Sequence, residues 1–203
     1  MMAGQSKLNH MFLTAIALLL LAGCGTTAPT RFYILNPLAD TDTSSPAVEN
    51  EHISIALAPV KLPEHLNRPQ IVTRQAGHQV SVDEFNRWAE PLDIGFTTIL
   101  AENLSQLLDT DRVFITNRLK NTGFDFLLSV NVLRFHGWPG GEATLVCRWS
   151  LDKSGEPIGS APRRFTATRP VEGNDYPALV AALSQILADL SREIAEQILS
   201  EAS

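Results

Sequence analysis

The feature that most constrains the fold is a long amphipathic pattern over residues 176–201. Its apolar side chains recur at spacings of four, three, four and four residues: Leu183, Leu187, Leu190, Ile194 and Ile198. This period predicts one long helix with a single apolar face, and Asp175 and Pro177 suit its N-cap and first turn. The opposite face is expected to be wet, with Ser184, Gln185, Asp189, Arg192, Glu193 and Glu196. We expect this helix to dock on a core. A partner-binding or membrane-lying helix is the alternative, although an acidic polar face disfavours a membrane.

A second helix and several strands supply surfaces on which this helix can pack. Residues 91–108 have helical spacing, begin at Pro91, and can place Leu92, Ile99, Leu104 and either Leu107 or Leu108 on one stripe. Short β-branched and aromatic runs predict about seven strands, starting with residues 31–35. Together these parts predict one α/β domain, with α+β as the alternative. We expect a sandwich of a mixed β-sheet of about seven strands with two long helices on one or both faces.

The last three strands are predicted to form a meander over residues 124–168, with turns at 137–141 and 152–157. Alternation assigns two apolar faces there: Phe126, Leu128, Val130 and Val132 on one strand, and Leu145, Cys147, Trp149 and Leu151 on the next. Ser129 and Asn131 fall on the opposite face, which is expected to be only partly buried.

The N-terminus has the pattern of an export signal rather than of the fold. Lys7 is followed by an apolar run of twelve residues, 11–22, which is too short to span a bilayer stably. Leu21, Ala22, Gly23 and Cys24 resemble the bacterial lipobox, in which a peptidase cleaves before the cysteine and the cysteine carries the lipid. We therefore predict a lipoprotein signal peptide at 1–23, a lipidated tether at 24–30 and a periplasmic domain at 31–203. The alternatives are an ordinary signal peptide and a Cys24–Cys147 disulfide.

Composition and motifs favour binding over catalysis. The formal net charge of −6 disfavours a nucleic-acid partner, and two cysteines are too few for a disulfide scaffold. The nucleophile elbow, the phosphate-binding P-loop and the zinc-protease helix motif are not found, and the histidines fall at no metal-ligand spacing. Cys147 is expected to be a small buried hydrophobe, and Asp109 and Asp111 to be turn and capping residues rather than an acid–base pair. We expect neither an enzyme nor a metal site, and no cofactor except the lipid on Cys24.

One stretch concentrates residue types that dominate protein–protein hot spots. Between Leu66 and Leu92 it holds Arg68, Pro69, Gln70, Arg74, Arg87, Trp88 and Glu90. These residues could contact a partner. Alternatively they form a structural network, with Trp88 buried and Arg87 paired to Glu90 or another carboxylate. Trp138, in the turn of the meander, is a further candidate, either exposed or folded back onto the sheet.

The two halves of this stretch, Leu66–Arg74 (LNRPQIVTR) and Arg87–Leu92 (RWAEPL), resemble the PqiC-like or YmbA-like ABC-type transport auxiliary lipoproteins. The resemblance implies a non-catalytic accessory subunit, anchored by lipid in the outer membrane and facing the periplasm. Its implied partner is a periplasmic transporter subunit made of MCE domains, in a system that moves phospholipids or other hydrophobic molecules and supports envelope integrity. It also allows a homo-oligomer. Gly25, in place of Asp after Cys24, favours the outer membrane. A lipid-binding carrier, an envelope enzyme and a stand-alone structural lipoprotein stay open as alternatives.

Overall fold

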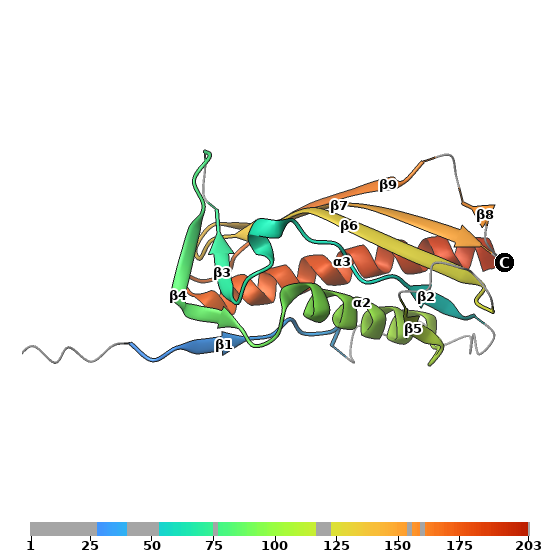
Figure 1. The fold of residues 1–203 in the computed structure, drawn as a ribbon, viewed down its shortest axis with the longest axis horizontal. Helices are drawn as coiled ribbons and strands as arrows, with labels where there is room; N and C mark the ends of the chain where they lie inside the picture. Colours follow the sequence, from blue (N-terminus) through green and yellow to red (C-terminus); the bar gives the residue numbers. More distant parts are fainter. Residues whose placement is uncertain are drawn as a thin grey trace, which may run out of the picture.

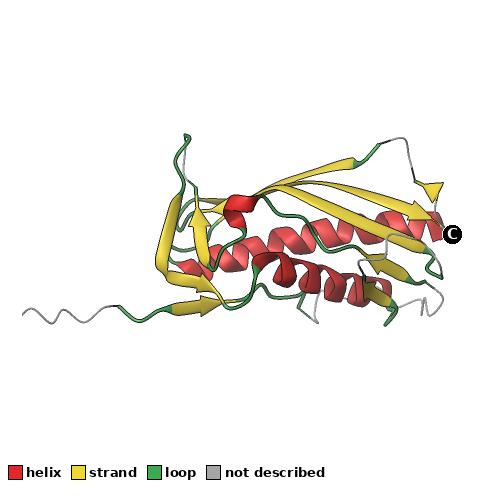
Figure 2. Cartoon of the chain, in the orientation of Figure 1, coloured by secondary structure: helices red, strands yellow, loops and turns green. Residues whose placement is uncertain are grey.

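The computed structural model describes residues 28–39, 53–74, 77–116, 123–153, 156–158 and 161–202. Two long helices lie beneath a twisted sheet, and a smaller sheet closes one end of the molecule (Figures 1 and 2). Along the chain the elements are β1 (Arg31–Tyr33), β2 (Ile55–Leu57), the 3-10 turn η2 (Glu64–Leu66), β3 (Gln70–Thr73), β4 (Ser81–Trp88), α2 (Leu92–Leu108), β5 (Val113–Ile115), β6 (Phe126–Gly137), β7 (Glu142–Lys153), β8 (Glu156–Pro157), β9 (Arg163–Pro170) and α3 (Tyr176–Ala202).

The strands divide between two sheets. The larger has the order β5-β2-β6-β7, and both β8 and β9 pair with β7. Here β2 runs parallel to β5 and β6, and the other pairs are antiparallel. The smaller has the order β1-β4-β3, with β1 parallel to β4. The expected α/β class, with mixed strands and two long helices, is confirmed. The division into two sheets was not foreseen, because η2 turns the chain away from β6 before β3 begins.

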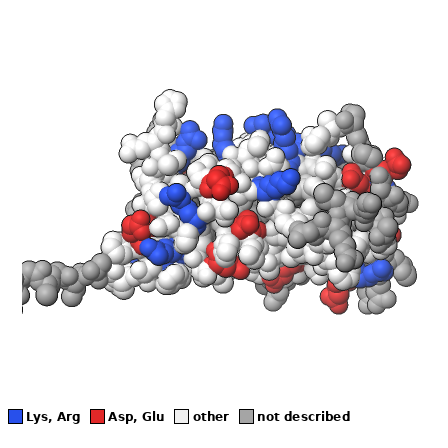
Figure 3. All heavy atoms as spheres, in the orientation of Figure 1, with Lys and Arg blue, Asp and Glu red and all other residues white. Residues whose placement is uncertain are grey.

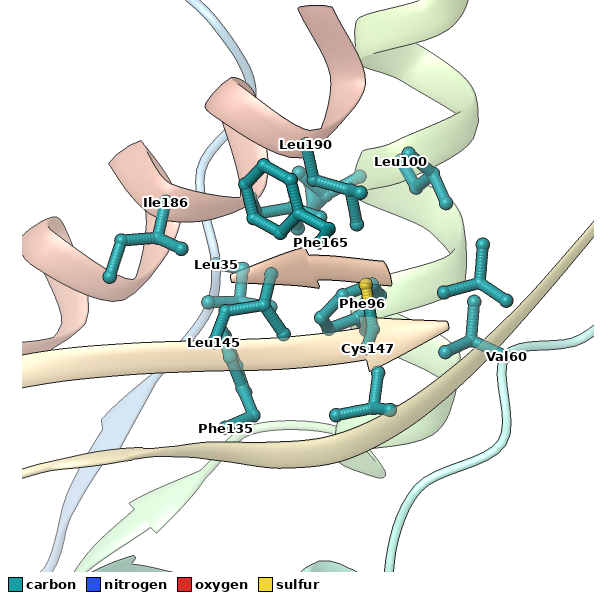
Figure 4. Close-up of a cluster of buried hydrophobic side chains, with 14 of the residues drawn as sticks. Leu35, Val60, Phe96, Leu100, Phe135, Leu145, Cys147, Phe165, Ile186 and Leu190 are labelled. Carbon is teal, nitrogen blue, oxygen red and sulfur yellow. The ribbon is translucent and has the colours of Figure 1, made fainter. Parts of the chain in front are cut away.

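The core lies between the large sheet and the two helices. The inward faces of the meander are buried as the alternation predicted, from Phe126 to Val132 on β6 and from Leu145 to Leu151 on β7. Phe96 of α2 meets Phe135 of β6 edge to face, with ring centroids 5.2 Å apart. Figure 4 shows how α2, α3 and the strands converge on this cluster. Leu108, at 1% exposure, occupies the position that the sequence left open between Leu107 and Leu108.

Helix α3 is buried on more than the expected stripe. Leu183, Leu187, Leu190, Ile194 and Ile198 all face the core, which confirms a core-docking helix. Ser184, however, was expected to be solvent-exposed and is buried. Its hydroxyl accepts a hydrogen bond from the Asn36 N–H (3.1 Å) and donates one to the Val180 carbonyl (2.9 Å). The prediction for Ser184 was wrong because the segment after β1 crosses this side of α3.

Local signals set the helix ends. Pro91 is the N-cap of α2, and Asp109 ends that helix in the left-handed conformation with φ of 48°. Asp109 is thus a turn and capping residue, as expected. The Asp175 carboxylate accepts a hydrogen bond from the Ala178 N–H (3.0 Å), which is the N-cap geometry predicted for α3.

The face of the large sheet turned away from the helices is open. Ser129 and Ser150 are half-buried there, and Asn131, Arg148 and Arg164 are exposed. Both helices therefore cover the same face, and the domain has two layers.

Candidate functional site

The two halves of the sequence motif lie side by side. Strands β3 and β4 pair antiparallel with Gln70 opposite Arg87, and the Trp88 N–H donates to the Pro69 carbonyl at 2.7 Å. Trp88 is buried, with 7% of its surface exposed. Pro69, Gln70, Arg87 and Trp88, separated by up to 19 positions in sequence, thus form one small patch of sheet.

The partner of Arg87 is Glu84 rather than Glu90. The Arg87 guanidinium donates to the Glu84 carboxylate (3.1 Å) and to the Glu84 carbonyl (3.0 Å), and the Gln70 amide donates to the same carboxylate (3.2 Å). The Glu90 side chain instead lies against Gly95 in the first turn of α2. The Glu84 carboxylate is largely solvent-exposed, so this ion pair contributes little to folding.

An exposed aromatic ring adjoins this network. Phe32 of β1 pairs in register with Arg87, so the two side chains share one face of the small sheet. Phe32 is 64% exposed. We call the set Phe32, Gln70, Glu84 and Arg87 the motif surface. It combines an arginine with an exposed aromatic ring, as hot spots commonly do.

The inward face of the small sheet is tied to α3 by half-buried hydrogen bonds. The Tyr176 hydroxyl donates to the Asp83 carboxylate (3.1 Å), and the Tyr33 hydroxyl donates to Asn86 (2.7 Å). Burial first, and then the hydrogen bond to Asp83, raise the pKa of the Tyr176 hydroxyl to about 12. The tyrosine therefore stays a donor at neutral pH, and these hydrogen bonds fix the motif surface to the rest of the domain.

The remaining motif residues lie elsewhere. Arg68 is exposed ahead of β3. Arg74 lies at the other end of β3, where its backbone N–H donates to the Gly137 carbonyl (3.2 Å) and its guanidinium to the Gly77 carbonyl (3.0 Å). Trp138 folds back over its own turn, with its ring against Gly141. It is half-buried, which answers the question that the sequence left open.

We expect Gly141→Ala to destabilise the domain. A Cβ at this position would meet the Trp138 ring, which must then move. The expected cost is about 1–3 kcal/mol of unfolding free energy, as for other overpacked sites, measurable by urea denaturation. The double variant Trp138→Ala/Gly141→Ala removes the obstacle, so the glycine substitution should cost much less in that background. An equal cost in both backgrounds would contradict the contact.

Other chemistry-bearing residues sit in structural roles. Cys147 is free and wholly buried, and burial first, then nearby Glu193, raise the pKa of its thiol to about 12. A thiol of that pKa is not a nucleophile at neutral pH, so the expectation of a small buried hydrophobe is confirmed. His136 is half-buried, and burial, followed by the charges of Arg74 and Arg134, lowers its pKa. Among the described residues no three histidine, cysteine or acidic side chains gather where they could hold a metal ion.

A groove on the open face of the large sheet was not found from the sequence. Its volume is about 600 Å³. The lining comes from β6, β7, the chain after β2 and Pro162: Ala58, Pro59, Val60, Lys61, Ser129, Val130, Asn131, Arg148, Trp149, Ser150 and Pro162. We call it the open-face groove. One signal was available, since alternation on β7 places Arg148 opposite Cys147 and Trp149, but no pattern showed that Lys61 would join it.

The lipobox residues Leu21, Ala22, Gly23 and Cys24 lie outside the described residues, so lipidation stays a prediction. Within the described ranges, none of the helices combines the length and the apolar character that a membrane crossing requires.

The fold defines a two-layer α/β domain shared with solved proteins. One crystal structure, of an uncharacterized protein, superposes with a TM-score of 0.68 at 23% identity, over 84% of this chain and 99% of that one. A second, from Xanthomonas campestris, gives a TM-score of 0.64 at 21% identity, over 85% and 99%. The chain belongs to the family of ABC-type transport auxiliary lipoprotein components, whose model matches residues 33–195.

Two curated relatives carry a more specific name. The intermembrane transport lipoproteins PqiC of Escherichia coli (strain K12) and of Shigella flexneri are each 26% identical over 187 residues, or 92% of this chain and 96% of the relative. The resemblance drawn from Leu66–Arg74 and Arg87–Leu92 is therefore confirmed. The chain is an auxiliary lipoprotein component of a transport system.

Proposed function

We propose that this protein is a non-catalytic accessory subunit of an MCE-type intermembrane lipid transport system. It is anchored by lipid in the outer membrane, faces the periplasm and supports envelope integrity. The observation that carries the proposal is the motif surface: Arg87 of the sequence motif and the exposed ring of Phe32 on β1 form one Arg–aromatic face rather than a catalytic pocket.

The tether limits where this surface can act. Strand β1 begins at Arg31, seven residues after Cys24. A fully extended segment of that length reaches roughly 25 Å. Phe32 is the next residue, so the motif surface stays within a short reach of the membrane that holds the lipid. In this arrangement the motif surface contacts the end of the MCE-domain partner that lies nearest the outer membrane.

The test is capture of the partner from cell envelopes. We expect tagged wild-type protein to copurify with an MCE-domain protein after mild crosslinking. Phe32→Ser and Arg87→Glu should each lower the recovery at least tenfold, because central aromatic and arginine anchors typically contribute more than about 1.4 kcal/mol. Light scattering of the purified lipoprotein measures whether it is an oligomer.

The matched control is Phe114→Ser. Phe114 is also an exposed aromatic residue, at 46%, but it lies on β5 at the opposite end of the domain (Figure 1). The Phe114→Ser variant should recover as much MCE-domain protein as the wild type. If the wild type recovers no MCE-domain protein, the proposed function is overturned. If all three variants lower that recovery equally, the motif surface is not the contact with the partner.

A further inference from the structure

A row of basic side chains crosses the open face of the large sheet. Lys61 pairs with Asn131, Asn131 with Arg148, and Arg148 with Arg164, each on the neighbouring strand. Residues in register on adjacent strands point to the same face, about 5 Å apart at Cβ. All four are exposed. Figure 3 shows several basic side chains in the upper part of the view, where Figure 1 places β6, β7 and β9.

The positive charge of this row is not neutralised within the described residues. Lys61, Arg148 and Arg164 make no ion pair there, whereas Arg87 and Arg169 pair with Glu84 and Asp189. Like charges directly opposite one another on paired strands are destabilising. Arg148 and Arg164 are such a pair, in a chain whose net charge is −6. Asp152, two positions from Ser150 on β7, is the acidic residue that follows on this face. An anion between the basic side chains would relieve their repulsion.

The floor of the open-face groove carries neutral polar groups. Ser129 and Ser150 are paired opposite each other, next to the Asn131–Arg148 pair, so two hydroxyls and an amide lie between the charges. These neutral donors and the flanking cations match the oxygens of a phosphodiester. Ala58 and Pro59, in the chain after β2, flank the groove beside β6, and Pro162, ahead of β9, flanks it beside β7, so each flank carries an apolar residue. A volume of about 600 Å³ holds more than a free phosphate ion, and is in the range of small-molecule sites.

We propose that the open-face groove binds the phosphate of an anionic phospholipid, with Lys61 and Arg148 on the phosphate oxygens and the glycerol against Ala58 and Pro59. Arg164 strengthens the positive field beside it. The apolar residues on both flanks favour a lipid over an acidic peptide, whose backbone would leave polar groups against Ala58, Pro59 and Pro162. The inference deepens the proposed function, on which it rests for the supply of phospholipid, by naming the headgroup class.

The test is calorimetric titration of the mature lipoprotein in a neutral detergent. The ligands are dihexanoyl-phosphatidylglycerol, dihexanoyl-phosphatidylcholine, glycerol 3-phosphate, inorganic phosphate and a short acidic peptide, each corrected for mixing with detergent alone. We expect phosphatidylglycerol to bind tightest. Arg148→Gln should weaken that binding about tenfold, the value of one charge-assisted hydrogen bond. Arg148→Lys should keep most of it. Arg31→Gln removes an exposed arginine on β1 and should change nothing.

Each outcome decides the proposal. Unchanged affinity in Arg148→Gln and in Lys61→Gln would overturn the site. Glycerol 3-phosphate or inorganic phosphate binding as tightly as the lipid would overturn the assignment to a lipid, and equal affinity for phosphatidylcholine would overturn the anionic class. Tighter binding of an acidic peptide would replace the lipid by a protein ligand. Partner capture through the motif surface does not involve this groove, so failure of one experiment leaves the other informative.

Discussion

Replacing Cys24 by alanine is expected to release this protein from the membrane while leaving its domain folded. Two or more acyl chains on one residue give stable anchoring, whereas one chain gives only marginal binding. The described helices offer no alternative span. The variant is exported behind a leader that the ordinary signal peptidase removes, so that no uncleaved leader holds it. Nearly all of it should then move from the outer-membrane fraction to the soluble periplasmic fraction.

Cys147→Ala is the matched control, because it removes the other cysteine of the chain. Cys147 is wholly buried, so this variant should lose some stability but keep its membrane attachment. Circular dichroism of the released Cys24→Ala protein should show the wild-type helix content. The lipobox interpretation is wrong if Cys24→Ala stays in the outer-membrane fraction at native levels in a strain without transport partners.

Periodic patterns could be predicted because they arise from burial of one face. The stripe of α3 and the alternating faces of β6 and β7 follow directly from that requirement. Ser184 shows where the argument stops. Its burial depends on residues 34–38 crossing α3, and a helical wheel contains no information about a segment about 150 positions away in sequence.

The candidate site divides in the same way. The motif stretch between Leu66 and Leu92 was visible as a concentration of arginine, tryptophan and proline. The choice of Glu84 over Glu90 as the partner of Arg87 depends on the local path of β4 around Asp83 and on the packing of Glu90 against Gly95. The row beside the open-face groove depends on four separate segments meeting in register, three with a single basic residue and one with Asn131. No local pattern marks such a row, because it runs across the strands rather than along the chain.

Among the polar residues of the core, a buried asparagine is the one whose replacement is expected to lower the stability of the domain most. Asn103 of α2 has no exposed surface. Its side-chain oxygen accepts a hydrogen bond from the Leu38 N–H (2.8 Å), and its amide donates to the Ser191 hydroxyl (3.1 Å). Ser191 itself donates to the Leu187 carbonyl (2.8 Å). One side chain thus joins α2, α3 and the segment after β1.

We expect Asn103→Leu to lower the unfolding free energy by roughly 2–4 kcal/mol, because the buried Leu38 N–H is left without an acceptor and the bond to Ser191 is lost. Urea denaturation followed by circular dichroism measures the loss. Ser191→Ala should cost less, about 1–2 kcal/mol, since it removes the acceptor of the Asn103 amide but leaves the Leu38 N–H paired. Gln185→Leu, an exposed polar residue of α3, should stay within about 0.5 kcal/mol of the wild type. If Asn103→Leu were as stable as Gln185→Leu, the segment after β1 would not be held by Asn103. The path from the tether to the core would then rest on the apolar burial of Leu35 and Leu38 and on the hydrogen bond from the Asn36 N–H to Ser184.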